Sequence, residues 1–87
     1  MADRPKLPVP PGEMAPQDLC DRILEWAQRM GFGFSQSPHA SEYAKVLVYD
    51  PRGGHSGATV PNAHKGRRLK KHQVRYTVNH INHNWRD

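Results

Sequence analysis

With 87 residues, the chain is long enough for one small domain with a thin hydrophobic core. Its single cysteine, Cys20, excludes a disulfide framework within the chain. No segment combines a basic start, an apolar run and a small-residue cleavage site, and no apolar run is long enough to span a bilayer. We therefore expect a cytoplasmic protein that makes no contact with membranes.

The charge is distributed unevenly along the chain. The formal net charge is +5, but residues 1–50 carry seven acidic and five basic side chains, whereas residues 51–87 carry eight basic side chains and one acidic side chain, Asp87. A solvated basic face without any partner would explain this, although such surfaces usually mix both signs. The asymmetry favours a polyanionic partner, which we expect to be a nucleic acid and RNA rather than DNA.

The N-terminal third contains an arm and a helix. Residues 1–13 hold four of the eight prolines, which predicts an extended arm that is either disordered or docked on a partner and need not join the core of a domain formed by residues 14–87. A helix is predicted over about residues 16–30, opened by Pro16 and stopped by Gly31. Trp26 lies off the centre of its apolar stripe, which consists of Leu19, Ile23, Leu24, Ala27 and Met30.

Three short strands are expected next, over residues 32–36, 43–49 and 56–60. Polar residues 37–41 predict a turn between the first two strands. The segment Asp50-Pro51-Arg52-Gly53-Gly54 has the chemistry of a tight turn, so the third strand should run antiparallel to the second.

A second helix is predicted over residues 69–85, because Val74, Val78, Ile81 and Trp85 repeat at spacings of four, three and four. The expected fold class is therefore α+β, in the order helix, three-stranded antiparallel sheet, helix. Both helices are expected on one face of the sheet.

The strongest candidate site is a basic segment that leads into the second helix. It contains six cations within eleven residues: Lys65, Arg67, Arg68, Lys70, Lys71 and Arg75. Cations at a helix start repel one another and oppose the helix dipole, so the fold tolerates them more readily when phosphates compensate. The segment predicts binding to a phosphate backbone with salt-sensitive affinity.

Histidine and tyrosine supply the remaining candidates. Six histidines are present, and histidine is the usual general acid or base near neutral pH. His80 and His83 could face one ion, but a zinc site wants four ligands and Cys20 is solitary, so we expect no metal and no cofactor. Tyrosine side chains can stack on bases, but at their spacing packing is an equal alternative for Tyr43, Tyr49 and Tyr76.

Several short motifs resemble one known family. They are Met30-Gly31-Phe32 after the first helix, the turn at residues 50–54, Thr59-Val60-Pro61 before the loop, and Gly66-Arg67-Arg68-Leu69-Lys70-Lys71 at the second helix. Together they resemble the HicA-type toxins, small mRNA interferases of toxin–antitoxin systems with a double-stranded-RNA-binding-domain-like fold. The resemblance covers roughly residues 15–82.

The resemblance implies a metal-independent endoribonuclease that cleaves mRNA. By position, His39 in Ser37-Pro38-His39 would be the single catalytic histidine, as general base or acid, and His64 resembles a second histidine of the family. His72, within the basic segment, is a further auxiliary candidate. The cations of the basic segment would hold phosphates, and a separately encoded antitoxin would cover the His39 surface. Two alternatives remain: a nucleic-acid-binding module of the same fold that cleaves nothing, and a small phage or regulatory protein that uses its proline-rich arm for protein interactions.

Overall fold

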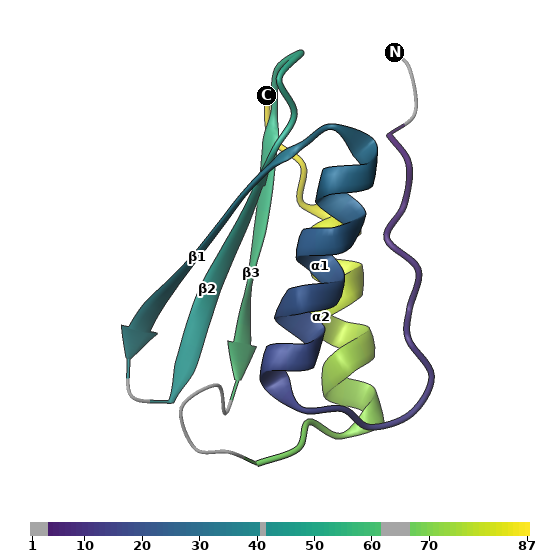
Figure 1. Cartoon of the computed structure of the whole chain (residues 1–87), viewed down its shortest axis with the longest axis vertical. Helices are drawn as coiled ribbons and strands as arrows, with labels where there is room; N and C mark the ends of the chain where they lie inside the picture. Colours follow the sequence, from purple (N-terminus) through teal and green to yellow (C-terminus); the bar gives the residue numbers. More distant parts are fainter. Residues whose placement is uncertain (1–3, 41, 62–66) are drawn as a thin grey trace.

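The computed structural model describes residues 4–40, 42–61 and 67–87, with the backbone alone for residues 38–40. The element order is α1 (Pro16–Met30), β1 (Gly33–Ala40), β2 (Tyr43–Tyr49), β3 (His55–Pro61) and α2 (Lys71–His83) (Figure 1). The three strands form one antiparallel sheet in the order β1-β2-β3. This confirms the predicted α+β class and the predicted order of elements. Among the described residues, no helix is long and apolar enough to cross a membrane.

The first strand is longer than the sequence predicted. We expected a strand over residues 32–36 and a polar turn over residues 37–41, but β1 continues through Pro38 and His39 to Ala40. A central strand needs the backbone N–H group that proline lacks. Pro38 is tolerated because β1 is an edge strand, which has a neighbour on one side only. The pairing with β2 shifts register between Pro38 and Ala40, which is where the strand leaves its regular ladder.

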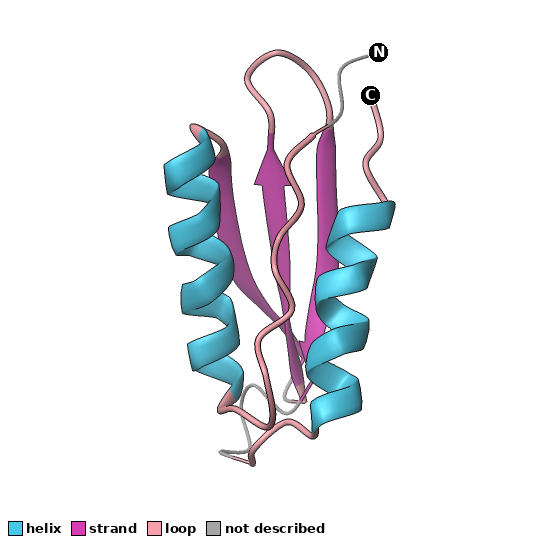
Figure 2. Ribbon diagram, turned by 90° about the vertical axis from the view of Figure 1, so that its right-hand side faces the viewer, coloured by secondary structure: helices cyan, strands magenta, loops and turns pink. Residues whose placement is uncertain are grey.

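The core lies between the sheet and the helices. Alternate residues of β2 and β3 are buried, as the pleat of a strand requires: Ala44, Val46, Val48, Ser56, Ala58 and Val60. Figure 2 shows α1 and α2 in front of the sheet, with the N-terminal arm running between them. From α1, Leu19, Ile23 and Ala27 are fully buried, and from α2, Val74, Val78 and Ile81 are.

One expectation about α1 was wrong. Met30 was expected in the apolar stripe, but it is 39% exposed, and Trp26, expected off the centre of the stripe, is 2% exposed. The chain reverses at Gly31, which brings Phe32 edge-on to Trp26 with ring centroids 5.5 Å apart. Phe32 in turn packs edge-on against Trp85 at 5.4 Å. These contacts across the molecule decide which side of α1 is buried at its C-terminal end.

The N-terminal arm is extended and joins the core, which the sequence did not require of it. Leu7 is 5% exposed and belongs to the core cluster. Nearer the start of the chain, the Arg4 guanidinium lies 4.6 Å from the centroid of the Trp85 ring and pairs with Asp50 at 3.5 Å and with Asp87 at 3.0 Å. The arm therefore contacts the β2–β3 turn and the C-terminal tail. It also contacts α2, through hydrogen bonds between Leu7 and Asn82.

The second helix is shorter at both ends than the predicted range of residues 69–85. Before α2, Leu69 is fully buried and forms an antiparallel backbone bridge with Met14. After it, Arg86 and His55 exchange two backbone hydrogen bonds of 2.8 Å. Extended backbone is needed for both bridges, so the helix is confined to Lys71–His83 although the apolar repeat continues to Trp85.

Candidate nucleic-acid interface

The cations of the basic segment gather around the start of α2. Lys65 lies outside the described residues. The others are all exposed: Arg67, Arg68 and Lys70 precede the helix, and Lys71 and Arg75 belong to it. The expectation that the segment opens the helix is correct only from Lys71 onward, because the bridge at Leu69 holds the preceding residues extended.

The start of α2 has no acidic group and no side-chain cap on its backbone N–H groups. Lys70 is the N-cap residue, and its ammonium group has no oxygen that could accept from the first helical N–H groups. The Gln73 side chain does not cap the first helical N–H groups either. Its Oε1 accepts a 2.8 Å hydrogen bond from the backbone N–H of Lys70, which precedes the helix. The positive end of the helix dipole therefore adds to the field of the surrounding cations.

Only part of this positive charge is balanced within the protein. Glu13 lies 4.0 Å from the Arg68 Nε and 3.8 Å from the Lys70 Nζ, and all three side chains are well exposed to solvent. Exposed pairs of this kind contribute little and are easily exchanged. Over the described parts of the chain, Arg67, Lys71 and Arg75 form no ion pair.

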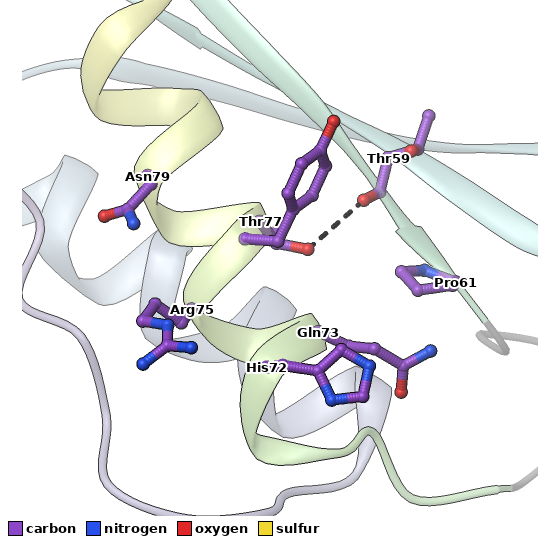
Figure 3. A pocket seen from close by; sticks show the side chains of 8 residues that line it. Thr59, Pro61, His72, Gln73, Arg75, Thr77 and Asn79 are labelled. Carbon is purple, nitrogen blue, oxygen red and sulfur yellow. Dashed lines mark hydrogen bonds between the residues drawn. The ribbon is translucent and has the colours of Figure 1, made fainter.

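A groove lies next to these cations, between α2 and β3. It has a volume of about 460 Å³ and is lined by Thr59, Pro61, His72, Gln73, Arg75, Tyr76, Thr77 and Asn79 (Figure 3). A smaller hollow of about 230 Å³ shares three of these residues and adds Lys45, Gly57, Ala58 and His80. Among the described residues, the lining of both hollows contains basic, polar and aromatic side chains and no acidic one.

Hydrogen bonds between α2 and β3 fix the walls of the groove. The buried Ser56 hydroxyl donates to the Ile81 carbonyl at 2.6 Å. The Thr77 hydroxyl donates to the Thr59 carbonyl at 3.5 Å, the bond dashed in Figure 3. The His80 Nδ1 lies 3.1 Å from the Gly57 carbonyl oxygen and 2.7 Å from the Asn84 Nδ2. Carbonyl groups along this edge of β3 are thereby satisfied by α2, so the groove has a rigid frame.

The candidate histidines are spread over the molecule. The backbone of His39 lies near the end of β1, where Pro38 is paired with Ala44 and Ala44 with Val60. This is the end of the sheet at which β3 leads toward the basic segment, but β2 lies between, and neighbouring strands are about 4.8 Å apart. The His39 side chain and all of His64 lie outside the described residues. His72 is exposed and lines the groove.

Sequence reasoning left the role of Tyr76 open and did not select Lys45 or His80. The structure separates the three tyrosines: Tyr76 is 70% exposed, Tyr49 is 43% exposed and Tyr43 is half-buried. A signal for Tyr76 was present, since it falls two residues from both Val74 and Val78 and therefore off the apolar face of α2. Lys45 and His80 line the smaller hollow only because α2 packs beside β3.

Cys20, the single cysteine, is buried in α1. Cys20 is 1% exposed, and burial, followed by the nearby negative charge of Asp21, raises the pKa of its thiol to about 11. The reactive thiolate is therefore scarce at neutral pH. Within the described ranges, no three histidine, cysteine, aspartate or glutamate side chains are grouped as metal ligands.

No protein-family model, curated protein or solved structure matches this chain. The resemblance to HicA-type toxins and the activity that it implies stay predictions.

Proposed function

We propose that the protein binds RNA through the basic segment at the start of α2. The observation that carries this proposal is the set of exposed cations around an uncapped helix start, with Glu13 as their one acidic partner in the described chain. Phosphate groups would satisfy both the cations and the free backbone N–H groups. The HicA resemblance favours RNA over DNA, and a cytoplasmic location is part of the same proposal.

The test is the salt dependence of RNA binding by the full chain, measured by fluorescence anisotropy. The logarithm of the affinity should fall linearly with the logarithm of salt concentration. Removing Arg67 and Lys71 together should lower the affinity and reduce the slope by about two. The matched control is Arg22→Ala with Arg29→Ala, which removes two exposed cations from α1. Binding that is absent, or that depends equally on both pairs, would contradict the proposal.

RNA cleavage is the second candidate function, favoured by the position of the His39 backbone at the end of the sheet that leads to the basic segment. In this mechanism, the 2′-oxygen attacks the adjacent phosphorus while its bond to the 5′-oxygen breaks, without metal. His39 either takes the 2′-hydroxyl proton or protonates the leaving 5′-oxygen, water serves the other proton transfer, and cations of the segment stabilise the pentacoordinate phosphate. An antitoxin would act by covering the His39 surface.

Growth and RNA integrity are compared on expression of the wild type, His39→Ala and His83→Ala, with cleavage repeated in EDTA using purified protein. His83 is an exposed histidine at the far end of α2, so it controls for loss of a surface imidazole. Cleavage should be lost in His39→Ala alone. If the wild type neither cuts RNA nor slows growth, the enzyme proposal fails and the binding proposal stands.

A further inference from the structure

The Tyr76 side chain is the most exposed large apolar group among the described residues. It is 70% exposed, although it is in the middle of α2 and close to β3. An exposed aromatic ring does not contribute the stabilisation that a buried tyrosine gives to a small fold. Single exposed apolar side chains are common, so exposure alone assigns no role to Tyr76.

The surroundings of Tyr76 are the second observation. It lines both the 460 Å³ groove and the 230 Å³ hollow beside it. The His80 ring, one helical turn later, lies 5.7 Å away at an interplanar angle of 34°. His72 is one turn earlier and lines the groove as well. Tyr76 is thus the centre of a row of three rings along the open side of α2.

The charges around this row are positive or neutral. Arg75 lines the larger hollow and Lys45 lines the smaller one, and no acidic side chain of the described chain lines either hollow. Figure 3 shows Thr59 and Pro61 of β3 facing His72 and Gln73 of α2 across the groove. Its volume is within the range of about 300–1,000 Å³ that is typical of small-molecule sites. A nucleotide fits these features, because its planar base can lie on the aromatic surface within the groove while its phosphates lie near the positive charges.

We propose that the groove between α2 and β3 takes an unstacked base of single-stranded RNA, with the Tyr76 ring as its stacking platform and Arg75 and Lys45 beside the flanking phosphates. This rests on the proposed RNA-binding function and names the form of RNA that the site selects. In a duplex, the faces of the bases are covered by their neighbours, so Tyr76 could not stack on them. In a single strand every base offers a free face.

The frame of the groove suits this role. The bonds from Thr77 to Thr59 and from Ser56 to Ile81 join α2 to β3 and do not involve Tyr76. The platform can therefore be removed without disturbing its support. Asn79 also lines the groove and is exposed, on the side of α2 away from Thr59 and Pro61 in Figure 3, and its amide can bond to polar groups of the bound nucleotide.

The experiment compares a short single-stranded oligoribonucleotide with the same sequence in a duplex, by anisotropy at fixed salt. Tyr76→Ala should weaken single-strand binding about 5- to 150-fold, the range expected for loss of one stacked base. Tyr76→Phe should retain the affinity, because the ring alone carries the contact. A 2-aminopurine in the single strand should be quenched by the wild type and much less by Tyr76→Ala. Tyr49→Ala, which removes an exposed ring from β2, is the matched control.

The outcomes separate this inference from the proposed function. If Tyr76→Ala binds the single strand as tightly as the wild type while the Arg67 and Lys71 variant loses affinity, the groove proposal is overturned and RNA binding stands. Duplex binding that equals or exceeds single-strand binding also overturns it. If no form of RNA binds in a salt-dependent manner, the proposed function itself fails. Loss of single-strand affinity in Tyr76→Ala with an unchanged salt slope supports the proposal.

Discussion

The side-chain amide of Asn82 in α2 holds both backbone polar groups of Leu7 in the N-terminal arm. Its Oδ1 accepts from the Leu7 N–H at 2.8 Å, and its Nδ2 donates to the Leu7 carbonyl at 3.0 Å. An amide side chain thereby replaces a neighbouring strand for one residue of an otherwise irregular segment. This pair of bonds keeps the Leu7 side chain in the core.

We expect Asn82→Ala to destabilise the protein by about 1–3 kcal/mol, because both backbone groups of Leu7 lose their partner in a partly buried setting. Urea denaturation measures the change, and hydrogen exchange at the Leu7 amide should accelerate. Asn79→Ala removes an exposed amide from the same helix and should change stability by less than about 0.5 kcal/mol. Equal effects of the two substitutions would show that the arm is not held in this way.

Ser56→Ala tests the bond that joins β3 to the end of α2. The Ser56 hydroxyl is 1% exposed and donates to the Ile81 carbonyl at 2.6 Å. Its removal leaves that carbonyl without its donor inside the protein, which costs about 1–3 kcal/mol. Ser35→Ala, a half-buried serine of β1 on the face away from the helices, is the control and should cost less. A neutral Ser56→Ala, measured by thermal unfolding, would contradict this.

The stability of the protein should fall in acid through Asp50. Its side chain accepts from the Arg52 backbone N–H at 2.9 Å and from the Arg52 side chain at 3.2 Å, and these bonds, helped by the charges of Arg52 and Arg4, hold the pKa of Asp50 below its ordinary value of 3.8. A carboxyl whose pKa is lower in the folded state stabilises the fold above its unfolded pKa. That contribution is lost as the pH falls through the folded pKa.

Urea unfolding of the wild type and Asp50→Asn from about pH 7 to about pH 2.5 checks this. The wild type should be the more stable at neutral pH, and the difference should shrink in acid. Asp18→Asn controls for the removal of one acidic charge from an exposed site. A stability difference between wild type and Asp50→Asn that is constant over this range would contradict the role given to Asp50.

The Cys20 thiol should be unreactive in the folded protein. Burial raises its pKa to about 11, so little thiolate exists at about pH 8, and solvent reaches the sulfur poorly. Alkylation by iodoacetamide, followed by mass spectrometry, should be slow in buffer and fast in concentrated urea. Labelling at the same rate in both conditions would show that this face of α1 opens freely.

Glu13→Gln should increase the affinity for RNA. Glu13 is the acidic partner of Arg68 and Lys70 at 4.0 and 3.8 Å, so its neutralisation releases two cations to phosphates. We expect a gain of a few fold at low salt that shrinks as salt is added. Glu25→Gln, at an exposed position in the middle of α1, makes the same charge change away from the segment and should have a smaller effect. Equal gains would indicate that net charge alone governs binding.

Local patterns were sufficient for the central elements. The apolar spacing from Leu19 to Ala27 predicted α1 within its observed bounds, and the run of β-branched and aromatic residues predicted β2 over Tyr43–Tyr49. The turn chemistry at residues 50–54 predicted the antiparallel hairpin. These features depend on neighbours a few residues apart, so the sequence alone carries them.

The candidate site was only partly predictable for the same reason. The basic segment is visible in the sequence because charge is a property of composition. The groove is not, because it needs α2 to lie against β3, with Thr77 bonded to Thr59 across 18 positions of the chain. The sequence places Tyr76 off the apolar face of α2, but only that packing places it beside a groove.

By itself, the sequence determined the α+β order, the positions of α1 and β2, and the concentration of positive charge after residue 50. The tertiary structure alone decided where α2 begins and ends, that the arm is held by Asn82, and that Tyr76 stands over a groove. The ends of α2 are set by backbone bridges from Leu69 to Met14 and from Arg86 to His55. Long-range pairing of this kind overrides the local apolar repeat, because each bridge satisfies backbone groups that a continued helix would have bonded elsewhere.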